Sequence, residues 1–159
     1  MSRPFPHLRT RDLEGTELDL PQALAGDPSV VIIAFKRQQQ TTVDTWLPWL
    51  TELRARTPEM EVYEVPTISR RWLPARRMID GGMRAGIPDP ATRRRTLTTY
   101  TDVSAVLDAF ALDGTGRIAV VVVDAGGTIL WIGVGEYDTV LAAELERAVT
   151  IARGPAGSA

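Results

Sequence analysis

Two runs of consecutive apolar, mostly β-branched residues constrain the fold of this chain most strongly. They are Val30–Phe35 and Ile118–Val123. A strand with one face in water alternates apolar and polar residues, whereas a strand buried on both faces is apolar throughout. Both runs are far shorter than the about 20 residues that a membrane-spanning helix needs. They therefore predict central strands of a sheet that is covered on both sides.

The segments around these runs predict alternating strands and helices. A helix is expected over Thr42–Arg56, because apolar residues recur there every three or four positions, and Pro48 should kink it. Met60–Pro66 alternates as a second strand that the proline ends. A hairpin with its turn at 125–127 and a helix over Tyr137–Arg153 follow. We therefore expect an α/β fold, in which a βαβ unit and a ββα unit form a central mixed β-sheet flanked by helices.

The length of 159 residues suits one domain. We predict a single domain over 1–153, with an N-terminal hairpin at 5–20, a helical insert at about 67–96, and a disordered tail at 154–159. The first residues lack the apolar stretch of a secretory signal. The expected location is the cytoplasm, and peripheral attachment to a membrane is left open.

The helical insert lies between the two units and concentrates arginine. Between Pro66 and Thr98, eight arginines stand against Asp80 and Asp89, which gives this segment a charge of +6. The whole chain carries −2, so the remainder carries −8. Such an asymmetry favours a surface that faces an acidic partner.

Two interpretations of the insert remain open: a solvated helical face with ion pairs inside the molecule, or a surface for an acidic protein or a lipid headgroup. On a helix, Arg70, Arg77 and Arg84 would share a face because they are seven residues apart. Nucleic acid is disfavoured, because the chain is acidic and no aromatic residues alternate with the arginines. The candidate anion-binding residues are Arg70, Arg71, Arg77, Arg84, Arg93, Arg94 and Arg95, and Trp72 is the candidate interface anchor.

The chain contains no cysteine and only one histidine. Thiol–disulfide exchange needs a thiolate that attacks sulfur, so this chemistry is excluded. A zinc site needs several cysteine or histidine ligands. We therefore expect no catalytic residue of the thiol type, no metal and no cofactor, and we leave enzymatic activity of another kind open.

Several features resemble the thioredoxin-like superfamily. The leader Phe5-Pro6-His7-Leu8 resembles that of peroxiredoxins, and Pro48 follows Phe35 as the kinking proline of thioredoxins follows the first buried strand. In that register, the redox Cys-x-x-Cys is replaced by Gln40, Thr41, Thr42 and Val43. The resemblance implies a thioredoxin-like fold with a degenerate redox site. A helix cap by Thr41 or Thr42 and a retained groove for an anion or peptide both fit this stretch.

A narrower resemblance is to the mitochondrial ATP synthase assembly factor family, which serves the membrane-embedded Fo sector. It is carried by the segments 35–40, 43–48, 70–72 and 84–88, and by Val123-Asp124, Gly127, Trp131, Gly133 and Gly135. Members have a thioredoxin-like fold without redox cysteines and act as assembly chaperones. The resemblance implies a non-catalytic protein that binds a protein client. The alternative is an oxidoreductase-like member of the superfamily that acts without cysteine, or a degenerate stress-related domain.

Overall fold

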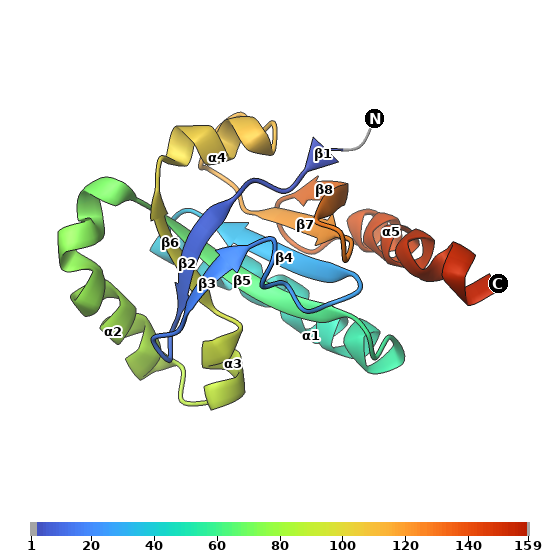
Figure 1. The fold of residues 1–159 in the computed structure, drawn as a ribbon, viewed down its shortest axis with the longest axis horizontal. Helices are drawn as coiled ribbons and strands as arrows, with labels where there is room; N and C mark the ends of the chain where they lie inside the picture. Colours follow the sequence, from blue (N-terminus) through green and yellow to red (C-terminus); the bar gives the residue numbers. More distant parts are fainter. Residues whose placement is uncertain (1–2, 159) are drawn as a thin grey trace.

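The computed structural model describes residues 3–158, with side chains up to residue 152, and its main feature is one mixed sheet of eight strands (Figure 1). Along the sheet the strands follow the order β1-β8-β7-β4-β5-β6-β2-β3. Strands β4, β5 and β6 are parallel, and the other neighbours are antiparallel. The strands are β1 (Arg3–Pro4), β2 (Leu8–Asp12), β3 (Glu17–Leu20), β4 (Ser29–Ala34), β5 (Glu61–Ser69), β6 (Leu97–Thr101), β7 (Ala119–Val123) and β8 (Thr128–Val134).

Helices cover both faces of this sheet, which confirms the predicted fold class. The helical elements are η1 (Arg37–Gln39), α1 (Gln40–Arg56), η2 (Arg70–Ala75), α2 (Arg76–Gly86), α3 (Pro90–Arg94), α4 (Val103–Ala109) and α5 (Thr139–Ser158). The Arg-rich insert is helical as expected, and it comprises η2, α2 and α3. Among the residues that the structure describes, no helix is long and apolar enough to cross a membrane.

Alternate side chains of the central strands enter two separate cores. Val30 and Ile32 of β4 pack with residues of α1 and α5, including Trp46. Val31 and Ile33 pack on the opposite face with residues of α4 and of the N-terminal hairpin. All four β4 side chains have no exposed surface. The uninterrupted apolar run in the sequence follows directly from this burial on both faces.

Strand β5 and helix α5 run further than the sequence predicts. Pro66 does not end β5, because it occupies the last pair with β4, just before pairing with β6 begins at Thr67. Pro66, which has no N–H to donate, therefore lies between the residues that pair with β4 and those that pair with β6. Helix α5 continues to Ser158 instead of ending at Arg153.

The approach of Gly26 to the sheet gives a test of this packing. A Cβ at Gly26 would lie 2.5 Å from the carbonyl oxygen of Pro28 and 2.7 Å from the backbone nitrogen of Glu61. We expect Gly26→Ala to lower the free energy of unfolding by about 1–3 kcal/mol in urea titrations. The matched control is Gly82→Ala, because Gly82 lies in helix α2 with open space around it and should gain about 0.5–1 kcal/mol. Equal effects of the two changes would contradict this packing.

Candidate functional site

The positions predicted for the degenerate redox site form the first turn of α1. Gln40 and Thr41 are exposed, whereas Val43 is 1% exposed and belongs to the core beside β4. Neither Thr41 nor Thr42 caps the helix with its side chain, since the hydroxyl of Thr41 donates to the carbonyl of Gln38. The single turn η1 directly precedes α1, so Gln39 is the N-cap residue of α1.

Gln39 is the buried polar residue at the centre of this site, and the sequence analysis did not single it out. Its Oε1 accepts hydrogen bonds from the backbone N–H groups of Phe35, at 2.8 Å, and Lys36, at 3.1 Å. Its Nε2 donates to the carbonyl of Thr115 at 2.8 Å. Gln39 thus ties the end of β4 to the loop that leads into β7. Its only signal in the sequence is a run of three glutamines, of which two are exposed.

Replacing Gln39 tests whether this carboxamide holds the site together. We expect Gln39→Ala and the size-matched Gln39→Met each to lower the free energy of unfolding by about 2–3 kcal/mol. The reason is that two N–H groups and one carbonyl lose their partner. Urea unfolding measures the change. The control Gln38→Ala, at an exposed neighbour, should stay within about 0.5 kcal/mol of wild type. Wild-type stability of Gln39→Met would show that the three contacts do not matter.

An open cavity of about 370 Å³ lies beside this site, between α1, β5 and the segment that ends α3. Gln40 connects the two, because its Nε2 lies 3.3 Å from Oε1 of Glu64 in the cavity wall. The cavity combines an apolar floor with hydroxyl and charged groups. Its lining consists of Leu47, Leu50, Thr51, Arg54, Ala55, Val62, Glu64, Thr92, Arg95 and Thr96.

Burial raises the pKa of Glu64 above its ordinary value of 4.5. The nearby carboxylate of Asp44 acts in the same direction, and the hydrogen bond from Gln40 opposes both. The second carboxylate of this region, Glu61, is instead held by the guanidinium of Arg54 through contacts of 2.9–3.2 Å. Glu64 is the one carboxyl among the residues that line the cavity, and its burial favours the protonated form.

The sign of the pH effect at Glu64 follows from linkage. A carboxyl whose pKa is higher in the folded state binds more protons there, so stability falls as pH rises from 4.5 through the folded pKa. We expect Glu64→Gln to raise the free energy of unfolding at pH 7 and to flatten its decline above pH 4.5. The control Glu61→Gln should lose about 0.5–1 kcal/mol at pH 7, because it breaks the contact with Arg54. Urea unfolding at several pH values measures both changes. A lower free energy of unfolding of Glu64→Gln at pH 7 would contradict the raised pKa of Glu64.

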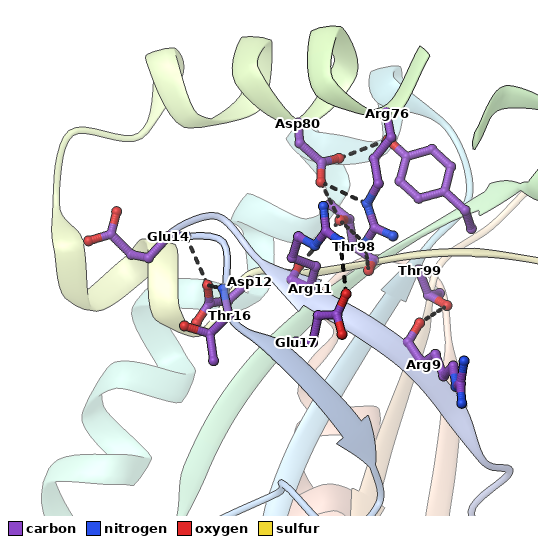
Figure 2. A network of polar contacts seen from close by, with 11 residues as sticks. Arg9, Arg11, Asp12, Glu14, Thr16, Glu17, Arg76, Asp80, Thr98 and Thr99 are labelled. Carbon is purple, nitrogen blue, oxygen red and sulfur yellow. Dashed lines mark hydrogen bonds and ion pairs between the residues drawn. The ribbon is translucent and has the colours of Figure 1, made fainter. Parts of the chain in front are cut away.

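Part of the arginine cluster holds the insert against the sheet (Figure 2). On α2, Arg76 and Asp80 form an ion pair with Nε and Oδ2 3.3 Å apart, and both side chains are less than one-fifth exposed. Asp80 also accepts a hydrogen bond from the hydroxyl of Tyr100 at 2.8 Å and lies 3.0 Å from the hydroxyl of Thr98. The guanidinium of Arg76 lies over the Tyr100 ring, 4.7 Å from its centroid. Burial and the bond to Asp80 raise the pKa of Tyr100 far above its usual range.

Two of the predicted anion-binding arginines are also used within the molecule. Arg84 and Arg93 both face the carboxylate of Glu14, at 3.4 Å and 3.7 Å. Arg93 further donates to the backbone carbonyls of Ile87 and Arg84. The predicted common face of Arg70, Arg77 and Arg84 is not formed, because Arg70 lies in η2 rather than in α2 and Arg84 turns to the N-terminal hairpin. The ion-pair interpretation therefore holds for these members of the cluster.

The remaining members face solvent. Arg70, Arg71, Arg77 and Arg94 are exposed, and Arg95 lines the cavity. The predicted anchor Trp72 is 49% exposed beside Arg71. Within residues 3–158, no three histidine, aspartate or glutamate side chains converge in a way that could hold a metal ion.

Comparison with known proteins identifies the fold. No protein-family model and no curated protein matches the sequence. Solved structures do match over nearly the whole chain. A putative electron transfer protein from Aquifex aeolicus VF5 has a TM-score of 0.67 at 16% identity, and the match covers 96% of this chain and 97% of that one. A thiol:disulfide interchange protein from a Bacteroides species has a TM-score of 0.63 at 18% identity, with 94% and 90% covered.

A third similar structure is a member of the Sco family of cytochrome c oxidase assembly proteins, with a TM-score of 0.59 at 11% identity and 94% and 95% of the two chains covered. These identities show a shared architecture and do not transfer a function. The fold of this chain is thioredoxin-like. The chain combines this fold with the absence of cysteine, and Gln39 lies next to Gln40, where the sequence analysis expected a redox residue to be replaced.

Proposed function

We propose that this protein is a non-catalytic member of the thioredoxin-like class that binds a protein client, as an assembly factor does. The observation that carries the proposal is the bridging carboxamide of Gln39. It joins the end of β4 to the loop at Thr115, next to Gln40, where a redox pair was expected. A hydrogen-bonded amide in this place supports a fixed surface rather than a reactive group.

Two tryptophans among the residues that carry the assembly-factor resemblance make packing contacts inside this fold. Trp46 has no exposed surface, and its indole N–H donates to the carbonyl of Gly135 at 3.0 Å. The ring of Trp131 covers Gly133, where a Cβ would meet it at 2.3 Å. Both contacts lie in the core region formed by α1, β8 and α5. Trp46 is therefore a core residue, and a client would contact exposed residues instead.

The cavity beside Gln40 is the surface that we assign to the client. Its apolar floor is formed by Leu47, Leu50 and Val62, and it is large enough for one or two side chains of a bound segment. Arg95 and Glu64 at its wall offer one charge of each sign. A segment that places apolar groups on the floor and polar groups at the wall would be complementary to it.

The cavity also favours a second candidate function, an enzyme of the same superfamily that acts without cysteine. Glu64, with its raised pKa, is the group such an enzyme would use as an acid or base. This candidate predicts turnover of a small molecule that depends on Glu64. The client-binding proposal predicts binding without turnover.

Filling the cavity tests whether the client binds there. Thr51 is exposed at the cavity wall, and Glu52 is its exposed neighbour on α1 outside the lining. A photo-reactive residue in place of Gln40 identifies the client in cells, and calorimetry with the purified client measures affinity. We expect Thr51→Trp to weaken binding at least about tenfold, because the indole occupies the floor. Glu52→Trp is the control and should bind like wild type.

Two outcomes would overturn the proposal. One is equal client affinity of Thr51→Trp and wild type, which would remove the cavity from the interface. The other is a small-molecule turnover that Glu64→Gln abolishes while folding is retained, which would favour the enzyme. Reduction of insulin and consumption of peroxide serve as baselines, since a chain without cysteine supplies no thiol for either reaction.

A further inference from the structure

The start of the helical insert exposes an unusual group of large apolar side chains. Trp72 and Leu73 on η2 are 49% and 50% exposed, and Met78 on α2 is 76% exposed. Elsewhere in the described chain, only Val140 and Ile151 on α5 are comparable. Single exposed apolar residues are ordinary, but three within seven positions form a candidate interaction surface.

Exposed arginines are neighbours of these apolar residues in the sequence. Arg70, Arg71 and Arg77 are exposed, and none forms an ion pair within the part of the chain that the structure describes. The guanidinium of Arg71 lies over the indole of Trp72, 5.4 Å from the ring centroid. We call these six residues the η2–α2 patch: Arg70, Arg71, Trp72, Leu73, Arg77 and Met78.

The acidic group closest in sequence cannot neutralise the patch. Asp80 is turned to the sheet side, where it bonds with Arg76 and Tyr100. The patch therefore keeps its positive charge, and the insert as a whole carries +6 against −8 for the rest of the chain. Such a charge separation orients the molecule before contact, with the insert toward a negative surface.

The patch also lies at the periphery of the molecule. In Figure 1, α2 and the turn before it form the outer layer at the left of the view, away from α5. The cavity described above is lined by α1, β5 and residues 92–96, and none of the six patch residues lines it. None of the six patch residues belongs to the edge strands of the sheet, β1 and β3. A bound peptide segment would need a groove or an open strand edge, whereas a lipid surface needs neither.

We propose that the η2–α2 patch docks this protein on an anionic phospholipid surface. Arg70, Arg71 and Arg77 would contact phosphate groups, and their aliphatic stems reach along the apolar surface. Trp72 would lie at the headgroup level, where indole rings are enriched, with Leu73 and Met78 beside it. This proposal is independent of the client-binding function, because it uses no residue of the cavity or of the Gln39 site.

Vesicle sedimentation tests the proposal with the full chain. Phosphatidylcholine vesicles with and without phosphatidylglycerol are compared at low and high salt. The wild type should sediment only with the anionic vesicles, and salt should release it. Each arginine near such a surface contributes roughly a fivefold factor in affinity, so the triple change of Arg70, Arg71 and Arg77 to Gln should weaken binding more than about tenfold. Trp72→Ala combined with Leu73→Ser should do the same at constant charge.

Matched controls separate the patch from net charge and from general apolar exposure. Arg37, Arg117 and Arg147 are exposed and lie outside the insert, so their triple change to Gln alters the charge equally and should leave binding within about twofold. Val140→Ser with Ile151→Ser removes equally exposed apolar side chains on α5 and should also bind like wild type. Urea unfolding verifies that every variant is folded.

A second measurement reads the quenching of tryptophan fluorescence in the wild type and assigns it to Trp72 with one conservative variant. Brominated lipids quench an indole that enters the headgroup boundary, and Trp72→Leu should remove this quenching while it keeps the apolar contact. No sedimentation with anionic vesicles at low salt would overturn the proposal. Equal losses in the patch and control triples would also overturn it. So would capture of soluble polyglutamate without capture of vesicles, since the partner would then be an acidic protein segment.

Discussion

The burial of the central strands on both faces is the constraint on which the rest of this structure depends. Val30 and Ile32 face one core, while Val31 and Ile33 face the other, so β4 has no side that tolerates water. The chain must therefore cross from β4 to its parallel neighbour β5 over a covered face, and α1 makes this crossover. The N-terminus of α1 then lies at the carboxyl end of β4, beside the loop that enters β7. Sheets of this kind carry their functional sites at this end.

At that end, the side-chain amide of Gln39 makes three hydrogen bonds to the backbone. A primary amide combines an acceptor and a donor in one rigid group, so Gln39 accepts from Phe35 and Lys36 and also donates to Thr115. Sulfur is a weak partner in either direction. Three directed bonds fix the turn before α1, and the exposed Gln40 links this fixed turn to Glu64 in the adjoining cavity.

Local periodicity predicted the order of strands and helices along the chain, but it could not predict contacts between residues that are distant in the sequence. The strands around Val30 and Val120 and the helix after Thr42 follow from patterns within a few residues. Gln39 could not be chosen over its two neighbouring glutamines, because its partner Thr115 is 76 positions away. The same limit applies to Arg84, whose partner Glu14 lies on the N-terminal hairpin. The sequence analysis did not name the Arg76–Asp80 pair either, although its i,i+4 spacing is a local signal; the bond from Tyr100 to Asp80 has no such signal.

The insert shows how one cluster of like charges divides into two roles. None of the residues of η2, α2 or α3 is buried, so the hydrophobic effect contributes little to holding this segment on the sheet. Polar contacts hold it instead. Asp80, which is paired with Arg76 on the same helix, bonds to Thr98 and Tyr100 of β6, and Arg93 of α3 faces Glu14 on the N-terminal hairpin. Charge-assisted contacts need a partner in matched geometry. Arg70, Arg71 and Arg77, which form no ion pair in the described chain, are exposed. An insert fixed by its inner polar face keeps the opposite face, with Trp72, available for a surface outside the molecule.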